Sequence, residues 1–469
     1  MKHIKRNVRG SLFALLGLFM ILTGYYFYNL FVYSDRWFSD PNNTRIKVDM
    51  ENPSILPGNI QDRNQNVLVE TKSTIKKDGK TTYYRSYRDD CRYAAHVIGS
   101  KRYGIGAEVL YIRYLLGYNN NLLERIYQKA FLDQEVGNNV ILTIDMQLQK
   151  YITEVMGSQK GSVVLMDPRS GEILAMVSLP SFNPAQENEE PGEESLLNKA
   201  SYGRYPPGSI MKVVTAAAAL ESGEDIRKDT LECKGSTDVG GIRINCYGQE
   251  AHGTVDLPRA MEVSCNAYFA NLSLDMGWKQ LRETGEKFGF NKNFLFSDIK
   301  TAKSQLPLTR NTSRKELAWS GVGQGKVLVS PLHVALIASS VANGGEMPNP
   351  KLIHGIQTRN GTIRYSTSHG TLSKPISPET AGKLKDMMIQ AVENGTGRNA
   401  RTSGMLIAGK TGTAETQEDQ NPHSWFMGFA PADEPTLAIA VVLENAGTGG
   451  AKAATMAGKI LRKAVRLGY

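Results

Sequence analysis

The chain has 469 residues, which is too long for one ordinary hydrophobic core and predicts two or more domains. Its formal net charge of +9 would suit nucleic acid, an anionic membrane surface or an anionic wall polymer, but the basic residues are not clustered enough to predict binding of nucleic acid. The seven histidines form no H-E-x-x-H motif, so no metal site is predicted.

An uncharged, apolar run at residues 12–33 follows a basic N-terminus. Its 22 residues are enough to cross a bilayer as one helix. Because cytoplasmic flanks carry an excess of Lys and Arg, we predict a cytoplasmic tail over residues 1–10, a transmembrane helix over 11–33 and an extracytoplasmic body at the cell membrane. A cleaved signal peptide is the alternative, but the run is longer than a usual signal h-region and no small-x-small cleavage site follows it.

Residues 34–150 mix short strand-like pieces with turns, such as those at residues 58–64 and 104–108. None of these pieces contains a plausible nucleophile with its base. The G-I-G at residues 104–106 lacks the third glycine and the strand–turn–helix context of a nucleotide-binding loop. This segment is therefore predicted to be a supporting pedestal domain.

A second domain is predicted over residues 151–469. It opens with two strands joined by a turn, over residues 162–166 and 172–178, and helical stretches follow Ser209 and Leu257. It closes with three strands over residues 405–415, 424–430 and 436–444 and a helix over 451–467. Strands at both ends of a domain with helices between them predict an α+β fold with one central antiparallel sheet flanked by helices.

Three short motifs follow one another in this second domain: S-I-M-K at residues 209–212, S-C-N at 264–266 and K-T-G at 410–412. Together they predict a serine acyl-transfer site. A second S-x-x-K at residues 73–76 lies in a Lys-rich polar stretch, and a second S-x-N lies at 181–183. Only Ser209 opens an apolar run typical of a buried helix, so order and context favour the first set.

Ser209 is the predicted nucleophile and Lys212 the predicted base. A lysine three residues after a serine lies on the same helix face, within reach of its hydroxyl. Burial lowers the pKa of a lysine from about 10.4, so that the neutral amine can take a proton near neutral pH. A second cation nearby, Lys410, is expected to lower the pKa of Lys212 further.

The S-C-N and K-T-G motifs supply the remaining candidate groups. Ser264 can relay the proton to a leaving amine, and Asn266 can hold the substrate backbone and Lys212, although a helix-capping pair is the competing interpretation. Lys410, Thr411 and Thr413 on an edge strand can bind a carboxylate, and Gly412 lets the substrate approach the backbone. The backbone N–H groups of Ser209 and of a residue near Thr413 can form an oxyanion hole.

Cys233 and Cys246 bracket a Gly-rich segment in a compartment where disulfides persist. They can form a disulfide or remain as two thiols in a hairpin, and the sequence leaves both alternatives open.

The three motifs in their contexts, Y-P-P-G-S-I-M-K at residues 205–212, S-C-N at 264–266 and K-T-G-T-A-E at 410–415, resemble those of the penicillin-binding protein transpeptidase domain. Residues 43–45, 58–64 and 104–108 resemble the short motifs of the class B pedestal, and the chain has no room for a glycosyltransferase domain. The resemblance implies a monofunctional, class B peptidoglycan D,D-transpeptidase that is a target of β-lactams.

That resemblance also implies a reaction and partners. Ser209 attacks the D-Ala-D-Ala bond of a donor stem peptide, D-Ala leaves, and an acceptor amine takes the acyl group without any cofactor. The implied partner is a membrane glycan polymerase of the shape, elongation, division and sporulation family. Roles in elongation, division and sporulation are not distinguished by the sequence.

Three other functions use the same motifs. A D,D-carboxypeptidase or a serine β-lactamase would pass the acyl-enzyme to water, and a non-catalytic β-lactam-binding scaffold would not turn over. The E-S-L-L-N at residues 194–198 resembles a deacylating element of β-lactamases but precedes Ser209, whereas that element lies between the second and third motifs in class A enzymes. We therefore interpret it as coincidence.

Overall fold

The computed structural model describes residues 2–38, 55–75, 81–100, 102–118, 126, 130, 135–186, 190–223, 230–294, 296, 299–358, 360–365, 370–415, 421–447 and 450–469. The resemblance noted at residues 43–45 lies outside these residues, as does the lysine of the S-x-x-K at residues 73–76.

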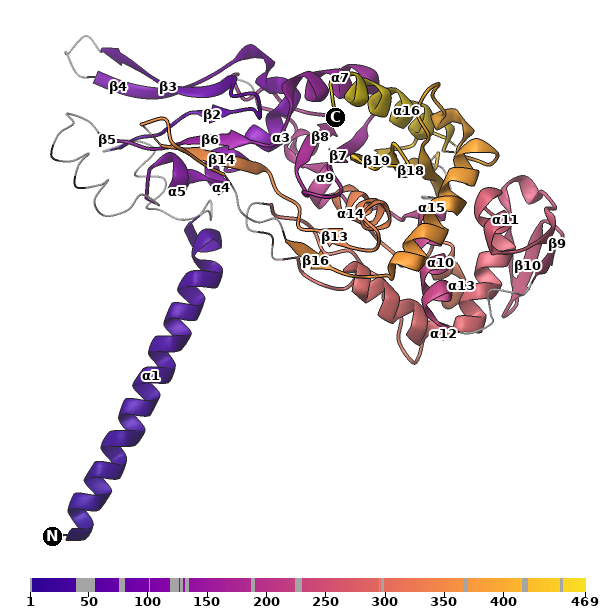
Figure 1. Ribbon diagram of the computed structural model, residues 1–469, viewed down its shortest axis with the longest axis horizontal. Helices are drawn as coiled ribbons and strands as arrows, with labels where there is room; N and C mark the ends of the chain where they lie inside the picture. Colours follow the sequence, from indigo (N-terminus) through magenta and orange to yellow (C-terminus); the bar gives the residue numbers. More distant parts are fainter. Residues whose placement is uncertain are drawn as a thin grey trace.

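Helix α1 (Lys2–Phe38) extends away from the body of the molecule (Figure 1). Its central part, residues 10–30, is long and apolar enough to cross a membrane, and its apolar side chains are exposed. A helix of 37 residues is about 55 Å long, which exceeds the thickness of a bilayer core. The predicted transmembrane segment therefore lies inside one continuous helix.

A five-stranded antiparallel sheet forms the centre of the C-terminal domain, in the order β17-β18-β19-β7-β8. Strands β7 (Gly161–Met166) and β8 (Ile173–Leu179) form the predicted opening hairpin. Strands β17 (Ala408–Ala414), β18 (His423–Ala430) and β19 (Leu437–Leu443) come from the other end of the domain, and β19 pairs with β7. The predicted sheet built from both ends of the domain is confirmed.

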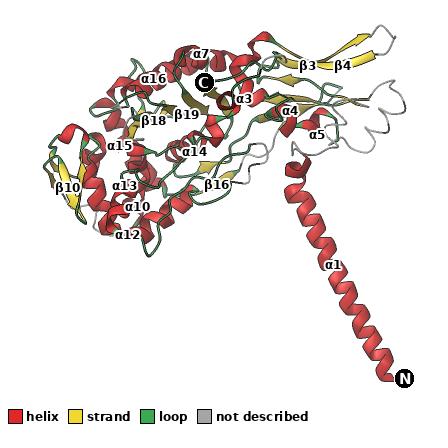
Figure 2. Cartoon of the chain, turned by 180° about the vertical axis from the view of Figure 1, so that it is seen from behind, coloured by secondary structure: helices red, strands yellow, loops and turns green. Residues whose placement is uncertain are grey.

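Helices cover both faces of this sheet because its strands are apolar on both sides. Alternate residues such as Val163 and Val441 pack with helices α7 (Met146–Met156) and α16 (Ala451–Arg466). Their neighbours Val164 and Val442 belong to the other core cluster, which includes α14 (Pro331–Ala342). The helical layers lie above and below the sheet in Figure 2.

A six-stranded sheet lies between the body and α1, in the order β15-β14-β6-β2-β3-β4 (Figure 1). Its strands are β2 (Ile60–Gln61), β3 (Val67–Ile75), β4 (Thr81–Tyr87), β6 (Asn139–Leu142), β14 (Ile353–Gln357) and β15 (Ile363–Tyr365). Strand β14 pairs with β6, so this sheet combines segments from both sides of residue 150. This pairing links the segment before residue 150 directly to the segment after it.

A small lobe at the far end of the molecule is built from residues 231–265 (Figure 1). It contains two short two-stranded sheets and a helix, namely β9 (Leu231–Cys233), β10 (Ser236–Val239), β11 (Ile242–Asn245), β12 (Gly253–Val255) and α11 (Leu257–Glu262). The 23-residue helix α12 (Asn266–Phe288) begins directly after it.

The remaining elements connect these layers. They are β1 (Ile55–Leu56), β5 (Glu135–Val136), β13 (Met347–Pro348), β16 (Thr371–Ser373), α3 (Ala95–Ile98), α4 (Ala107–Leu110), α5 (Ile112–Leu115), α8 (Glu193–Leu196), α9 (Lys199–Tyr202), α10 (Met211–Glu221), α13 (Arg314–Gly321), α15 (Pro378–Glu393) and the 3-10 turns η1 (Asp89–Ala94), η2 (Gly208–Ile210), η4 (Tyr247–Gln249) and η5 (Arg398–Ala400).

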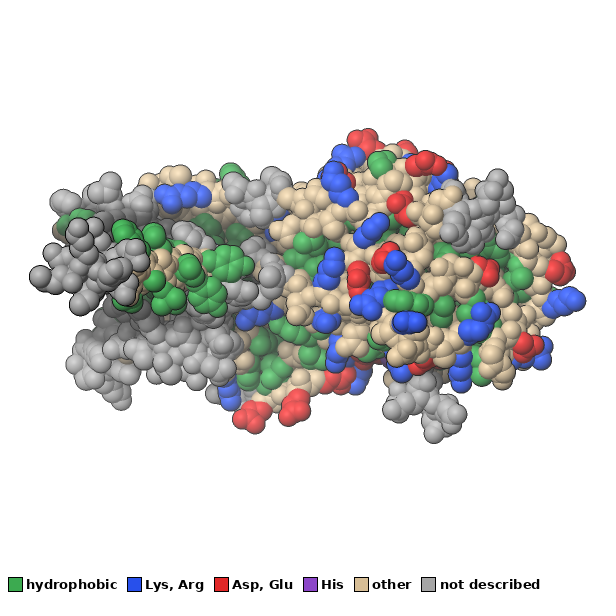
Figure 3. Space-filling view, turned by 90° about the horizontal axis from the view of Figure 1, so that it is seen from below, with side chains coloured by type: hydrophobic (Ala, Val, Ile, Leu, Met, Phe, Trp, Pro, Cys, Tyr) green, Lys and Arg blue, Asp and Glu red, His purple; other side chains and the backbone are tan. Residues whose placement is uncertain are grey.

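The face shown in Figure 3 carries Lys and Arg side chains interspersed with Asp and Glu over the body of the molecule. A nucleic-acid-binding face would instead gather one sign of charge.

Candidate functional site

Ser209 lies in the single 3-10 turn η2, immediately before helix α10. Two contacts hold this turn: the Gly208 N–H donates to the Gly323 carbonyl at 2.8 Å, and the Trp425 indole Nε1–H donates to the Pro206 carbonyl at 3.0 Å. Ser209 is only partly buried, while the helix that follows is buried along most of its length. The predicted nucleophile is thus partly accessible just before a buried helix.

Gly323 is required by its close approach to the nucleophile turn. A Cβ at this position would lie 2.0 Å from the Gly208 carbonyl oxygen, and the backbone has φ +82°. The Gly-rich segment at residues 321–325 therefore supports the turn that carries Ser209, a role that its composition did not reveal.

We expect Gly323→Ala to lower the free energy of unfolding by about 3 kcal/mol, because backbone strain and overpacking add at this site. Acylation of the remaining folded protein should slow about tenfold or more, since Gly208 precedes Ser209. Denaturant unfolding and labelling with a fluorescent penicillin measure the two effects. Gly344→Ala is the control, because Gly344 also has a positive φ but nothing lies within 4 Å of an added Cβ; equal effects of the two changes would contradict this role.

Lys212 is fully buried in the first turn of α10 and connects two of the motifs. Its Nζ donates to the Ser264 carbonyl at 2.7 Å, to the Asn266 Oδ1 at 2.6 Å and to the Ser264 Oγ at 3.1 Å. The first two partners can only accept, whereas a hydroxyl can accept or donate. A neutral amine can therefore keep both carbonyl contacts and direct its lone pair toward the hydroxyl side of the site.

Burial lowers the pKa of both lysines of the site. For Lys212 desolvation lowers the pKa to about 8, and the nearby thiols of Cys265 and Cys246 oppose this change. For Lys410 desolvation comes first and the positive charge of Lys212 comes second, and together they hold its pKa well below the usual value. We expected Lys410 to lower the pKa of Lys212, but Lys410 is not among the causes of that shift; instead the charge of Lys212 lowers the pKa of Lys410.

The rate of acylation should rise with pH through about pH 8, because only the neutral form of Lys212 accepts the proton of Ser209. Below this pH the amine is protonated in the folded protein and the base is lost. A pH profile of the second-order rate constant for a fluorescent penicillin measures the inflection. A flat profile between pH 6 and 9 would contradict the assignment of Lys212 as the base.

Ser264 lies between the two lysines. Its Oγ accepts from Lys212 at 3.1 Å and from Lys410 at 2.9 Å, and its backbone has φ +58°. The N-cap of α12 is Cys265, and Asn266 is the first residue of the helix, so the competing interpretation of a Ser–Asn capping pair is wrong. A strained backbone at a residue that joins two buried amines is typical of a functional site.

Asn266 is held from both ends of its side-chain amide. The Oδ1 accepts from Lys212, and the Nδ2 donates to the Asn245 carbonyl at 2.7 Å. The expected contact with Lys212 is therefore present, while the amide N–H group is engaged by the end of β11.

Lys410 lies on β17, which is the end strand of the five-stranded sheet, as the sequence predicted. The side chain is fully buried, and its Nζ donates to the Ser264 Oγ and to the Thr411 carbonyl at 3.1 Å. The structure thus brings Lys212, Ser264, Asn266 and Lys410 into one hydrogen-bonded network at the start of α10, α12 and the middle of β17.

Three other residues of β17, Thr411, Gly412 and Thr413, each make a different contact near this network. The Thr411 hydroxyl donates to the Thr396 hydroxyl at 2.9 Å, a partner that the motifs did not indicate. A Cβ on Gly412 would lie 3.0 Å from the Pro207 carbonyl, so this glycine accommodates the nucleophile turn itself. The Thr413 carbonyl accepts from the Gln324 side chain at 3.4 Å and so faces outward, away from β18.

The second S-x-x-K and S-x-N motifs lie in other parts of the fold. Ser73 is on β3 of the six-stranded sheet, and Ser181 follows β8. Glu194 forms ion pairs with Lys160 at 2.7 Å and Lys199 at 2.8 Å. These contacts account for the acidic residue of the E-S-L-L-N segment without a catalytic role.

All four cysteines are described by the structure, and each is a free thiol. Of the two alternatives for Cys233 and Cys246, the structure has the unpaired thiols. Both sulfurs lie near Cys265 of the S-C-N motif.

Comparisons with known proteins agree with this geometry. A family model described as the penicillin binding protein transpeptidase domain matches residues 161–462. The chain is 32% identical to the peptidoglycan D,D-transpeptidase PbpA of Mycolicibacterium smegmatis over 466 residues, covering 92% of this chain and 93% of that protein. It is 32% identical over 345 residues to the stage V sporulation protein D of Bacillus subtilis, covering 70% of this chain and 53% of that protein.

Among solved structures, penicillin-binding protein A of Mycobacterium tuberculosis in a penicillin G acyl-enzyme complex has a TM-score of 0.79 with 29% identity. The match covers 88% of this chain and 100% of the chain in that structure.

Proposed function

The chain belongs to the penicillin-binding protein transpeptidase family, and from this premise we propose that Ser209 forms the acyl-enzyme of a peptidoglycan D,D-transpeptidase. The observation that carries the proposal is the fully buried Lys212, whose amine joins the first two motifs and shares Ser264 with Lys410. Family membership supplies the reaction class, and this network supplies the candidate roles of individual residues.

Acylation begins with the hydroxyl of Ser209. Neutral Lys212 takes its proton as the Oγ attacks the carbonyl carbon of the D-Ala-D-Ala bond in a donor stem peptide. The backbone N–H groups of Ser209 and Thr413 stabilise the developing oxyanion, each donor contributing about 3 kcal/mol. The outward direction of the Thr413 carbonyl supports this role, because the N–H and C=O of one residue in an antiparallel strand point to the same side.

Departure of D-Ala requires a proton on its amine. The Ser264 hydroxyl is in contact with both amines and can pass a proton from Lys212 to the leaving nitrogen. An acceptor amine from a second stem then attacks the ester, and the same groups act in reverse to restore Ser209. Asn266 holds Lys212 in position during both steps.

Lys410, Thr411 and Thr413 bind the terminal carboxylate of the donor. The bound carboxylate favours the protonated form of Lys410, because an opposite charge nearby stabilises the cation, and the threonine hydroxyls are the expected hydrogen-bond donors. The Thr411 hydroxyl would exchange its contact with Thr396 for the substrate. β-Lactams present a similar carboxylate and carbonyl, and they would leave Ser209 acylated.

Helix α1 is compatible with a single-pass membrane anchor. The basic residues before its apolar part support a cytoplasmic N-terminus and an extracytoplasmic catalytic domain. A monofunctional transpeptidase leaves glycan polymerisation to another protein, and a membrane polymerase of the shape, elongation, division and sporulation family is the partner that we propose.

The full chain in detergent, incubated with a pentapeptide stem ending in D-Ala-D-Ala and with an acceptor stem, tests the proposal. We expect release of D-Ala together with a crosslinked dimer, detected by mass spectrometry. Release of D-Ala with only the hydrolysed tetrapeptide would indicate a carboxypeptidase instead, and rapid turnover of penicillin would indicate a β-lactamase. Penicillin labelling without release of D-Ala would favour the β-lactam-binding scaffold.

A further inference from the structure

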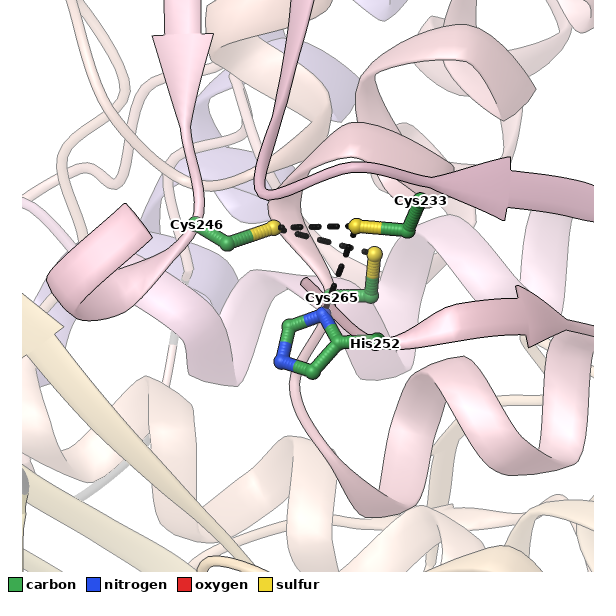
Figure 4. Close-up of side chains that lie close together, drawn as sticks. All are labelled: Cys233, Cys246, His252 and Cys265. Carbon is green, nitrogen blue, oxygen red and sulfur yellow. Dashed lines mark hydrogen bonds between the residues drawn. The ribbon is translucent and has the colours of Figure 1, made fainter. Parts of the chain in front are cut away.

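Four potential metal ligands converge at the junction between the small lobe and helix α12. They are the sulfurs of Cys233, Cys246 and Cys265 and the Nδ1 of His252, and all four atoms lie within 4.8 Å of one another (Figure 4). In the sequence they are separated by twelve, five and twelve residues. This spacing matches no short metal motif, which is why the sequence predicted no metal site.

Three of the six distances among these atoms have the values expected of a tetrahedral zinc site. With Zn–S bonds of about 2.3 Å and a Zn–N bond of about 2.0–2.1 Å, tetrahedral geometry separates two sulfurs by about 3.8 Å and a sulfur from a nitrogen by about 3.5 Å. The Sγ atoms of Cys233 and Cys246 are 3.7 Å apart, and those of Cys246 and Cys265 are 3.8 Å apart. Cys233 Sγ and His252 Nδ1 are 3.5 Å apart.

The four residues come from four separate segments that the fold brings together. Cys233 ends β9, and Gly253, the residue after His252, is its partner in β12. Cys246 follows β11, and Cys265 caps α12. The three cysteines are buried and His252 is partly buried, so the thiols point inward rather than to solvent. A lobe of short two-stranded sheets is the kind of structure that a bound metal stabilises.

A disulfide explains the cluster less well. A bond between two sulfurs requires about 2.05 Å, whereas the pairs here are nearly twice as far apart. One disulfide would also leave the third thiol and the imidazole without a common role. A tetrahedral cation uses all four donors, and three of their six separations already have tetrahedral values while all lie within 4.8 Å.

We propose that Cys233, Cys246, His252 and Cys265 bind one Zn²⁺ ion, which fastens the lobe to the start of α12. Rich thiolate coordination with one imidazole favours Zn²⁺ over Mg²⁺ or Ca²⁺, which prefer oxygen. Binding replaces the thiol protons, which are released to solvent, and leaves His252 neutral. This site lies outside the catalytic network, and its existence does not depend on the proposed function.

The metal site also supports the catalytic motif, an inference that rests on the proposed function. Cys265 stands between Ser264 and Asn266 in the chain, and Cys246 directly follows Asn245, whose carbonyl accepts from the Asn266 amide. An ion that holds Cys246 and Cys265 together therefore fixes the Asn245–Asn266 contact and, through it, the partner of Lys212. Cys233, Cys246, His252 and Cys265 are positioning residues in this scheme.

Metal content tests the site directly. The full chain is purified in detergent without chelators, and its metal content is measured by inductively coupled plasma mass spectrometry. It should contain about one zinc per chain. Cys233→Ser and His252→Gln should each reduce that content at least fivefold, whereas the control Cys91→Ser should not, because Cys91 is a buried cysteine of the pedestal region whose thiol donates to the Leu68 carbonyl. Wild-type protein that neither contains nor takes up zinc, or an intact mass showing a Cys233–Cys246 disulfide, would overturn the proposal.

Two further measurements keep the test independent of misfolding. Cobalt added to chelator-stripped wild-type protein should give the intense charge-transfer absorption of thiolate ligation in tetrahedral geometry, and an octahedral, weakly absorbing spectrum would contradict the site. Stripping zinc should slow acylation by fluorescent penicillin about tenfold, and zinc should restore it. An unchanged rate would overturn the coupling alone, whereas absence of acylation in zinc-loaded protein would count against the proposed function.

Discussion

Ser209→Ala should abolish covalent labelling by penicillin and lower the rate of crosslinking at least about 10⁴-fold. In the proposed mechanism the hydroxyl oxygen of Ser209 forms the ester, and a methyl group cannot replace it. Ser209 is small, partly exposed and outside the core, in the turn just before α10, so we expect the substitution to leave folding unchanged. Single-turnover labelling with a fluorescent penicillin measures the loss.

Ser73→Ala is the matched control for this experiment. Ser73 begins the other S-x-x-K of the chain but lies on the exposed part of strand β3. Its replacement should leave the labelling rate within about twofold, as is usual for surface substitutions. Labelling that survives in Ser209→Ala would show that another side chain is the nucleophile.

Lys212→Met should lower the rate of acylation by about 10²–10⁴-fold, which is the range expected for loss of a general base. Methionine has a similar length and fits a fully buried position, but it cannot accept the proton of Ser209. The substitution also leaves the Ser264 carbonyl and the Asn266 Oδ1 without their donor, so a decrease in stability should accompany the loss of activity. Stopped-flow acylation and thermal unfolding measure the two effects separately.

Lys150→Met provides the comparison, because Lys150 is an exposed lysine on α7 far from the three motifs in sequence. It should leave both measurements nearly unchanged. The pH dependence separates the base from a purely structural lysine: the rise in rate near pH 8 should disappear in Lys212→Met and persist in Lys150→Met. Acylation by Lys212→Met at the wild-type rate would remove Lys212 from the mechanism.

The sequence predicted the strands around the candidate site and the approach of the three motifs where local pattern and motif order determine them. The strands of the opening hairpin, β18 and β19 have largely apolar runs between turns, and their pairing follows from the layers that an α+β domain can form. The S-x-x-K, S-x-N and K-T-G motifs each lie at the start of a helix or on an end strand, and the fold brings them together.

What the sequence did not predict depends on contacts between distant segments. The pairing of β14 with β6 joins residues more than two hundred positions apart, and no periodicity within either strand indicates its partner. The role of Gly412 was assigned to substrate approach, but its close neighbour in the structure is the Pro207 carbonyl. Thr396 belongs to no motif and the sequence assigned no contact to Gly323, so only the tertiary structure reveals their contacts with Thr411 and Gly208.

The cysteine cluster shows the same limit. In the sequence, each cysteine taken alone looks like a small apolar core residue. The spacing of Cys233 and Cys246 suggested at most a disulfide. His252 lies beside them because β12 pairs with β9, and Cys265 because α12 begins next to these strands.

Peptide mapping of the penicillin adduct tests the central claim most directly. The full chain would be labelled with penicillin, digested with protease and analysed by mass spectrometry. Our account predicts one penicilloyl group per chain, located on Ser209. An adduct on any other serine, or no stable adduct in folded protein, would contradict it.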